Sequence, residues 1–254
     1  MSSEPPPPPT GPPPIGPPAP PTSLPAPAPP SPESEWGPSR VLLGFLLFLV
    51  VVFFETIVIQ FFDRDIDTLA GRLTLQGLLG ASLIVVAFAA ASPGSSVFAA
   101  PSALGWRRPK RGWIGPTLIA YFGYLACALV LAALLSPEQE DITRELGFDE
   151  GGFAAVAVGF LVIAMAPLSE EIFFRGFMFK GLRRGTPLVF AAALSSAVWG
   201  LFHYTGPDSW AVCLQLAVFG MFLAWLYERT GSIWPPIGVH MFNNTLAFAL
   251  LTST

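Results

Sequence analysis

The stretch VLLGFLLFLVVVFFETIVIQFF, residues 41–62, decides the fold class of this chain. It runs for 22 residues with a single charged side chain, Glu55. A helix of about 20 apolar residues crosses the ~30 Å of hydrocarbon in a bilayer. In lipid, a helix also pairs its backbone N–H and C=O groups within its own segment. The stretch therefore predicts a transmembrane helix.

Similar apolar runs recur along the rest of the chain. Its composition is 52% apolar and 12% charged, with a mean hydropathy of +0.59, whereas soluble domains devote about a quarter of their residues to charge. We expect an all-α, polytopic membrane helix bundle of about seven, at most eight, transmembrane helices. The seven expected spans are 41–62, 73–91, 114–135, 153–180, 187–204, 209–228 and 235–252.

The first 40 residues differ from everything that follows. They hold 18 of the 28 prolines, and proline fixes φ and removes a backbone donor, so such a segment favours extended, polyproline-II-like backbone. We expect residues 1–40 to form a disordered, proline-rich tail and residues 41–254 to form one membrane domain. We do not expect the tail to act as a signal peptide, because it lacks a basic start followed by an apolar core.

Charge and cysteine content exclude several classes of protein. The net charge is only -4 and is spread over separate loops, so no nucleic-acid partner is expected. Cys127 and Cys213 both lie in apolar runs without a neighbouring histidine or cysteine at metal-ligand spacing. A zinc finger or a disulfide scaffold is therefore not expected.

The loops predict the orientation of the chain. Loop 105–113, GWRRPKRGW, is basic, whereas loop 136–152, SPEQEDITRELGFDEGG, is mainly acidic. Basic loops stay in the cytoplasm. We expect an integral, multi-pass protein of the plasma or inner membrane with its N-terminus and tail in the cytoplasm and its C-terminus outside. Trp106, Trp113 and Trp234 fall at span ends, as interfacial aromatics do.

Few ionisable groups lie within the expected spans, and each costs about 2.5–3.5 kcal/mol to insert. The candidates for a functional role are Glu55, Glu170, Glu171, Arg175, His203 and His240. Their number is small, and both histidines of the chain are among them, which favours a shared polar site. Glu55 is interpreted equally well as a supporting group or as a side chain with a polar neighbour.

The segment APLSEEIFFRGF, residues 166–177, holds three of these charges. Glu171 and Arg175 are four residues apart, so they share a helix face in the favourable order for an ion pair and are expected to be structural. Glu170 is rotated by about 100° from Glu171 and has no cation one turn away. A carboxylate of this kind is a candidate general base.

The remaining polar groups come later in the chain. His203 follows Trp199 by four residues, and either Asn243 or Asn244 lies one turn beyond His240. By position along the helices, Glu170 and His203 have similar depths, whereas His240 is shallower. Either the helices protrude unequally or the segment GSIWPPIG, 231–238, contains extended backbone.

These three motifs resemble those of the CAAX prenyl protease and bacteriocin-processing (CPBP, or Abi) family of intramembrane endopeptidases. The family pattern is Glu-Glu-x-x-x-Arg, an aromatic residue four before a histidine, and His-x-x-x-Asn, here EEIFFR, WGLFH and HMFNN. The usual aromatic residue is Phe, and this chain has Trp199 instead. The resemblance covers residues 114–252, the expected protease core.

The resemblance implies hydrolysis of a peptide bond by water at the membrane. Glu170 and His203 would activate the water, His240 and Asn244 would donate hydrogen bonds to the oxyanion, and Glu171, Arg175 and Trp199 would support them. The expected partners are a peptide or protein substrate and the lipid bilayer. The alternative function is a non-catalytic one, as an immunity-type binder or a transporter that uses the same polar site.

No cofactor is expected. A glutamate and two histidines also form the ligand set of a catalytic zinc site, so the alternative is zinc or another divalent metal held by Glu170, His203 and His240. The chain lacks the His-Glu-x-x-His pattern of zinc proteases, which favours a metal-free, glutamate-dependent enzyme.

Overall fold

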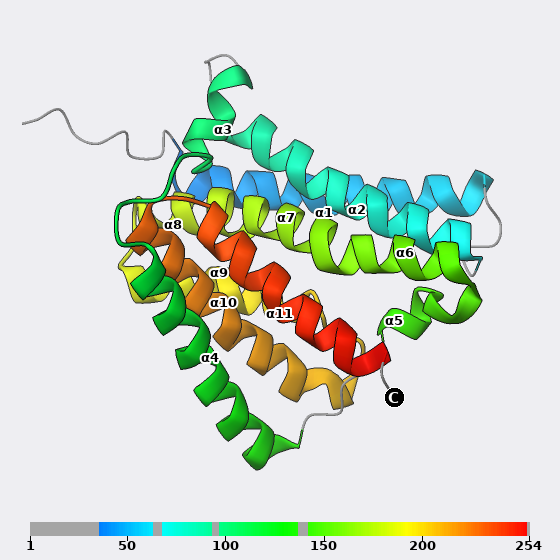
Figure 1. The fold of residues 1–254 in the computed structure, drawn as a ribbon. Helices are drawn as coiled ribbons and strands as arrows, with labels where there is room; N and C mark the ends of the chain where they lie inside the picture. Colours follow the sequence, from blue (N-terminus) through cyan, green and yellow to red (C-terminus); the bar gives the residue numbers. More distant parts are fainter. Residues whose placement is uncertain (1–35, 63–67, 93–96, 137–141, 253–254) are drawn as a thin grey trace, which may run out of the picture. The chain divides into compact units, whose positions relative to one another are not determined.

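The computed structural model describes residues 36–62, 68–92, 97–136 and 142–252. Every regular element among them is helical, as expected (Figure 1). The longer helices are α1 (Pro38–Phe62), α2 (Leu69–Ala91), α4 (Ile114–Leu135), α9 (Leu188–Leu201), α10 (Trp210–Thr230) and α11 (Trp234–Thr252). Shorter elements are η1 (Val97–Ala99), α3 (Ala100–Ala103), α5 (Ile142–Glu145), η2 (Phe148–Glu150) and η5 (Pro207–Ser209).

One further helix runs without a break from Gly152 to Arg183, and we call it the central helix. It consists of α6 (Gly152–Phe160), η3 (Leu161–Met165), α7 (Ala166–Glu170), η4 (Glu171–Phe179) and α8 (Lys180–Arg183). The elements η3 and η4 are π-helical. In Figure 1 the central helix lies beside α1 and α2, which both contact it.

Five helices of the described residues are long and apolar enough to cross a membrane, which identifies an integral membrane protein. They are Pro38–Phe61, Leu69–Ala91, Ile114–Leu135, Gly152–Arg183 and Pro207–Thr230. The other two expected spans are helical too, but α9 has only 14 residues and α11 is not among the five. Polar side chains at His240, Asn243 and Asn244 interrupt the apolar run of α11.

The start of the first helix differs from the expected boundary at residue 41. Helix α1 begins at Pro38, because proline suits the first turn, where its missing N–H has no helical partner. Trp36 is also buried, and its indole N–H donates to the carbonyl of Phe177 at 3.0 Å. Residues 36–40 therefore pack onto the membrane domain, while the rest of the expected tail, 1–35, lies outside the described residues.

The core of the bundle surrounds η4, in which all nine residues are buried. Its four phenylalanines pack with aromatic residues from elsewhere in the bundle, such as Phe48 of α1 at a ring distance of 5.1 Å from Phe173. Helices α9 and α10 approach closely at Gly200, where a Cβ would lie 2.5 Å from the Cys213 carbonyl. Small residues permit such contacts between membrane helices.

Candidate active site

The ion pair expected between Glu171 and Arg175 is present in the middle of the bundle. Arg175 Nη1 donates to Glu171 Oε1 at 2.8 Å, and both side chains are fully buried. The Arg175 guanidinium also lies over the Trp199 ring, 4.4 Å from its centre. A buried charge is tolerated only with such compensation, because its desolvation costs several kcal/mol.

Glu171 has a second partner on another helix. His240 of α11 is buried, and its Nδ1 lies 2.9 Å from Glu171 Oε1. A carboxylate accepts hydrogen bonds, so Nδ1 carries the proton and donates. This bond links the central helix to α11, which spacing along either helix alone did not predict.

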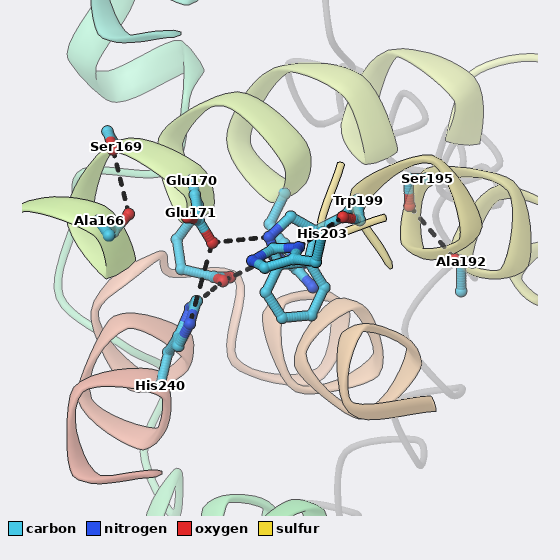
Figure 2. A network of polar contacts seen from close by, with 10 residues as sticks. Ala166, Ser169, Glu170, Glu171, Ala192, Ser195, Trp199, His203 and His240 are labelled. Atoms are coloured by element: carbon cyan, nitrogen blue, oxygen red, sulfur yellow. Dashed lines mark hydrogen bonds and ion pairs between the residues drawn. The ribbon is translucent and has the colours of Figure 1, made fainter. Parts of the chain in front are cut away.

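Glu170 has a partner that its own helix did not reveal. The Trp199 indole Nε1 donates to Glu170 Oε2 at 2.6 Å across the gap between α9 and the central helix. His240 Nε2 lies 3.9 Å from the same oxygen. Figure 2 shows the two adjacent carboxylates converging on His240 and Trp199. The sequence shows no cation one helical turn from Glu170, and it did not lead us to expect this neutral donor. The signal for the donor was Trp199 itself, because Phe, the usual residue of the family at this position, has no N–H.

A small cavity adjoins the Glu170 side chain, which is 16% exposed. Its volume is about 20 Å³, and its polar lining residues are Gln76, Ser169 and Glu170. A site of roughly 10–15 Å³ or more with polar partners accommodates one water molecule. The carboxylate therefore borders a space of the size needed for a single water.

His203 lies in the turn after α9 rather than within a span, because the helix ends at Leu201. Its Nδ1 lies 3.0 Å from the Trp199 carbonyl. A carbonyl only accepts, so Nδ1 donates and Nε2 of the neutral ring is left with its lone pair. The His203 ring packs edge-on against Trp199 at 5.4 Å. Among the described contacts, its link to the carboxylates runs through Trp199.

The last motif is ordered by α11, which starts at Trp234 with Pro235 and Pro236 in its first turn. The idea of extended backbone at these prolines is therefore wrong, since the first turn of a helix needs no N–H from them. His240 packs edge-on against Trp199 at 5.3 Å and Phe219 at 5.5 Å. Although the position of His240 along its helix predicted a shallower depth in the membrane, its side chain lies beside both carboxylates.

The choice between Asn243 and Asn244 is informed by one contact. The side-chain amide of Asn244 donates to the carbonyl of Val162, in the π-helical segment η3, at 2.9 Å. Asn243 has no hydrogen bond of this kind among the described residues. Asn244 therefore fastens α11 to the central helix, and an amide nitrogen with two N–H groups keeps a second donor.

Glu55 belongs to a different place. Its Oε1 accepts a hydrogen bond from Ser82 of α2 at 2.5 Å. Within the described part of the chain, no hydrogen bond or ion pair joins Glu55 to the carboxylates of the central helix. The interpretation as a side chain with its own polar neighbour is therefore favoured by this contact.

The alternative metal site involves the same side chains. Among the described residues, no three His, Cys, Asp or Glu side chains are grouped closely enough to hold a metal ion. The Nδ1 atoms of His203 and His240 face Trp199 and Glu171, respectively. Such bonds from Nδ1 leave Nε2 of each ring available as a ligand, so a metal-free site stays a prediction, and no step below passes through a metal.

Comparison with known proteins agrees with the motifs. Residues 152–246 match the family model of type II CAAX prenyl endopeptidase Rce1-like proteins, a range that contains all three motifs. The chain is 25% identical over 229 residues to the uncharacterized protein YyaK of Bacillus subtilis, covering 83% of this chain and 73% of YyaK.

A second relative is more similar over a shorter range. It is the Bacillus subtilis protein named "Putative membrane peptidase YdiL", which is 38% identical over 81 residues, or 32% of each chain. No solved structure matches the chain significantly. The three motifs thus lie within residues 152–246, the range in which the chain is similar to the Rce1-like type II CAAX prenyl endopeptidases.

Proposed function

We propose that this protein is an intramembrane endopeptidase of the CAAX-protease type that hydrolyses a peptide bond of a membrane-associated protein or peptide. The observation that carries the proposal is the Glu170 carboxylate, which borders a water-sized cavity and lies next to His240 in the buried core of the bundle. A positioned carboxylate beside a water and a set of hydrogen-bond donors is the minimum that peptide hydrolysis requires.

In the proposed reaction, Glu170 takes a proton from a water held in the cavity. His203 contacts Trp199 rather than the cavity, so we assign it to positioning Trp199 and, through the indole N–H, the Glu170 carboxylate. The oxygen of the water then forms a bond to the carbonyl carbon of the substrate, and the carbonyl π electrons move to its oxygen. When the C–N bond breaks, the proton passes from Glu170 to the leaving nitrogen, so that the carboxylate is regenerated.

The oxyanion of the tetrahedral intermediate needs donors that are already in place. We assign this role to Nε2 of His240, in its protonated form, and to the second amide N–H of Asn244. Glu171 orients the His240 ring through Nδ1 at 2.9 Å, and Arg175 balances the charge of Glu171. Trp199 positions the Glu170 carboxylate through its indole N–H.

The same proposal includes a cytoplasmic N-terminus and a metal-free mechanism. The metal-free mechanism is tested by exhaustive chelation of the detergent-purified protein, with cleavage as the readout. We expect full activity after chelation. A loss of activity that added zinc restores would replace the glutamate mechanism with a metal-dependent one.

The proteolytic function itself is tested in cells. Membrane and secreted proteomes are compared between cells that carry the wild-type protein, Glu170→Ala or His203→Ala, at equal levels of membrane insertion. We expect uncleaved precursors to accumulate in both variants. If both variants retain the phenotype and the cleavage products of the wild type, the protein acts as a non-catalytic binder or transporter instead.

A further inference from the structure

A large apolar groove lies between α4 and α11, away from the carboxylates. Its volume is about 810 Å³, which falls in the range of roughly 300–1,000 Å³ found for ligand sites. The lining residues are largely apolar or aromatic, including Leu118, Phe122, Val239 and Phe242. The hydroxyl of Thr117, one of the few polar groups, is already bonded to the Trp113 carbonyl at 2.8 Å.

The groove has one polar end. Arg108, from the basic loop before α4, lines it there together with Trp113 and Trp234. These tryptophans are 40% and 46% exposed. Tryptophan prefers the interface between lipid headgroups and acyl chains, so this end is at the membrane surface.

The length of the groove fits one leaflet of a bilayer. Along α11 it extends from Trp234 to Leu246, or about 18 Å at 1.5 Å per residue. Half of the hydrocarbon thickness of a bilayer is roughly 15 Å. A chain that starts at the interface therefore fills the groove and ends near the midplane.

The charge at the polar end is available to a ligand. Arg107 is engaged, since its Nε donates to the Gly231 carbonyl at 2.6 Å. Arg108 is exposed, and among the described residues it forms no ion pair with an acid. Lys110 and Arg111 add positive charge on the same loop.

We propose that this groove binds one anionic phospholipid, with acyl chain carbons between α4 and α11 and the phosphate at Arg108. An apolar slot one leaflet deep selects a lipid tail, and a cation at its interfacial end selects a negative headgroup. This site is separate from the proposed peptidase reaction and does not depend on it.

The chain offers sharp variants for a test. Gly238 lines the groove, and a Cβ there would meet nothing within 4 Å. Gly238→Leu therefore places a side chain in the groove with its Cβ clear of protein atoms, and Arg108→Gln removes the charge. Gly115→Leu on the exposed surface of α4 and Arg111→Gln in the same loop are matched controls, because neither residue lines the groove.

The measurement is native mass spectrometry of the delipidated full-length protein titrated with phosphatidylglycerol or phosphatidylcholine of identical acyl chains. We expect one phosphatidylglycerol to bind about five-fold more tightly than phosphatidylcholine, which corresponds to the ~1 kcal/mol that one basic residue contributes. Arg108→Gln should remove this preference, Gly238→Leu should prevent binding of both lipids, and the two controls should behave as wild type.

Several results would overturn the site. Equal binding of the two lipids by the wild type removes the headgroup preference, and an equal effect of Arg111→Gln and Arg108→Gln shows diffuse attraction to the loop. Lipid binding that survives Gly238→Leu, with thermal unfolding confirming a folded variant, excludes the groove. Dimers that Gly238→Leu converts to monomers would identify a second copy of the chain as the occupant.

Discussion

Trp199 makes two kinds of contact in the candidate site, and a single substitution separates them. Its ring lies under the Arg175 guanidinium and beside both histidines, while its N–H donates to Glu170 Oε2. Phenylalanine retains an aromatic ring at this position but has no donor. Trp199, which stands where the family usually has Phe, thus adds a hydrogen bond to the proposed base Glu170.

We expect Trp199→Phe to lower kcat by about 10- to 100-fold, the value of one hydrogen bond to a charged group. KM and the thermal unfolding temperature should stay close to wild type, because the ring still packs against Arg175 and the histidines. Steady-state kinetics and thermal unfolding of the same preparation check this. A fall in stability that parallels the fall in kcat would instead show that Trp199 acts only through packing.

Arg175→Ala tests the buried ion pair. The variant leaves the Glu171 carboxylate charged and buried without its cation, and breaking such a pair costs about 3–5 kcal/mol. We expect a strong loss of thermal stability in detergent and reduced yield. Unchanged stability would show that Glu171 does not depend on Arg175.

The sequence predicted contacts within one helix better than contacts between helices. The ion pair of Glu171 with Arg175 followed from four-residue spacing within one helix. The bonds from Trp199 to Glu170 and from His240 to Glu171 cross between helices. Helical periodicity gives the direction of a side chain on its own helix but not which side chain of another helix it meets.

At the level of the elements, the central helix differs from a regular α-helix by its two π-helical segments. Segment η4 begins directly after Glu170, and η3 ends just before α7. Such segments are frequent at functional sites, but apolar runs like LVIAM do not signal them in a sequence. Helix α9 is shorter than the expected span 187–204, because His203 and the residues after it form a turn. The sequence did not signal this end of the helix, since the apolar run continues through Leu201 and Phe202.

Gly220 of α10 tests how closely the helices pack over this region. A Cβ there would lie 2.7 Å from Arg175 Nη2 and 2.8 Å from Ser196 Cβ. We expect Gly220→Ala to destabilise the protein by about 1–3 kcal/mol, as overpacking does, and to lower activity by displacing Arg175. Thermal unfolding and cleavage rates measure both effects.

Gly77→Ala is the matched control for this substitution. It lies within α2, and a Cβ there would meet nothing within 4 Å. The better helix propensity of alanine should leave stability equal or slightly higher. Equal behaviour of the two variants would contradict close packing of α10 over Arg175.

For the whole molecule, the fold class followed directly from composition, because long apolar runs in lipid have only the helix available to them. The number of spans did not follow as directly. The run at 235–252 contains His240 and two asparagines, and these polar residues lower the hydropathy of its helix. Orientation rests on the contrast between the basic loop at 105–113 and the acidic loop at 136–152.

Labelling of single cysteines tests this orientation. In a background without Cys127 and Cys213, we expect Arg111→Cys to be protected from a membrane-impermeant maleimide in intact spheroplasts and labelled after permeabilisation. Asp149→Cys, in the acidic loop, should be labelled in both. The reverse pattern would place the N-terminus outside.

The central claim is that Glu170 activates the hydrolytic water, and it is tested most directly by the cleavage rate of purified Glu170→Gln on a substrate found by the proteome comparison. Glutamine retains the shape of the side chain and an oxygen for the Trp199 N–H, but it is not a base. Glu55→Gln is the matched control, since Glu55 is also in an apolar helix and contacts Ser82 instead. We predict that Glu170→Gln slows cleavage by about 10²- to 10⁴-fold while Glu55→Gln cleaves at nearly the wild-type rate. Cleavage by Glu170→Gln within a few-fold of wild type would contradict the account.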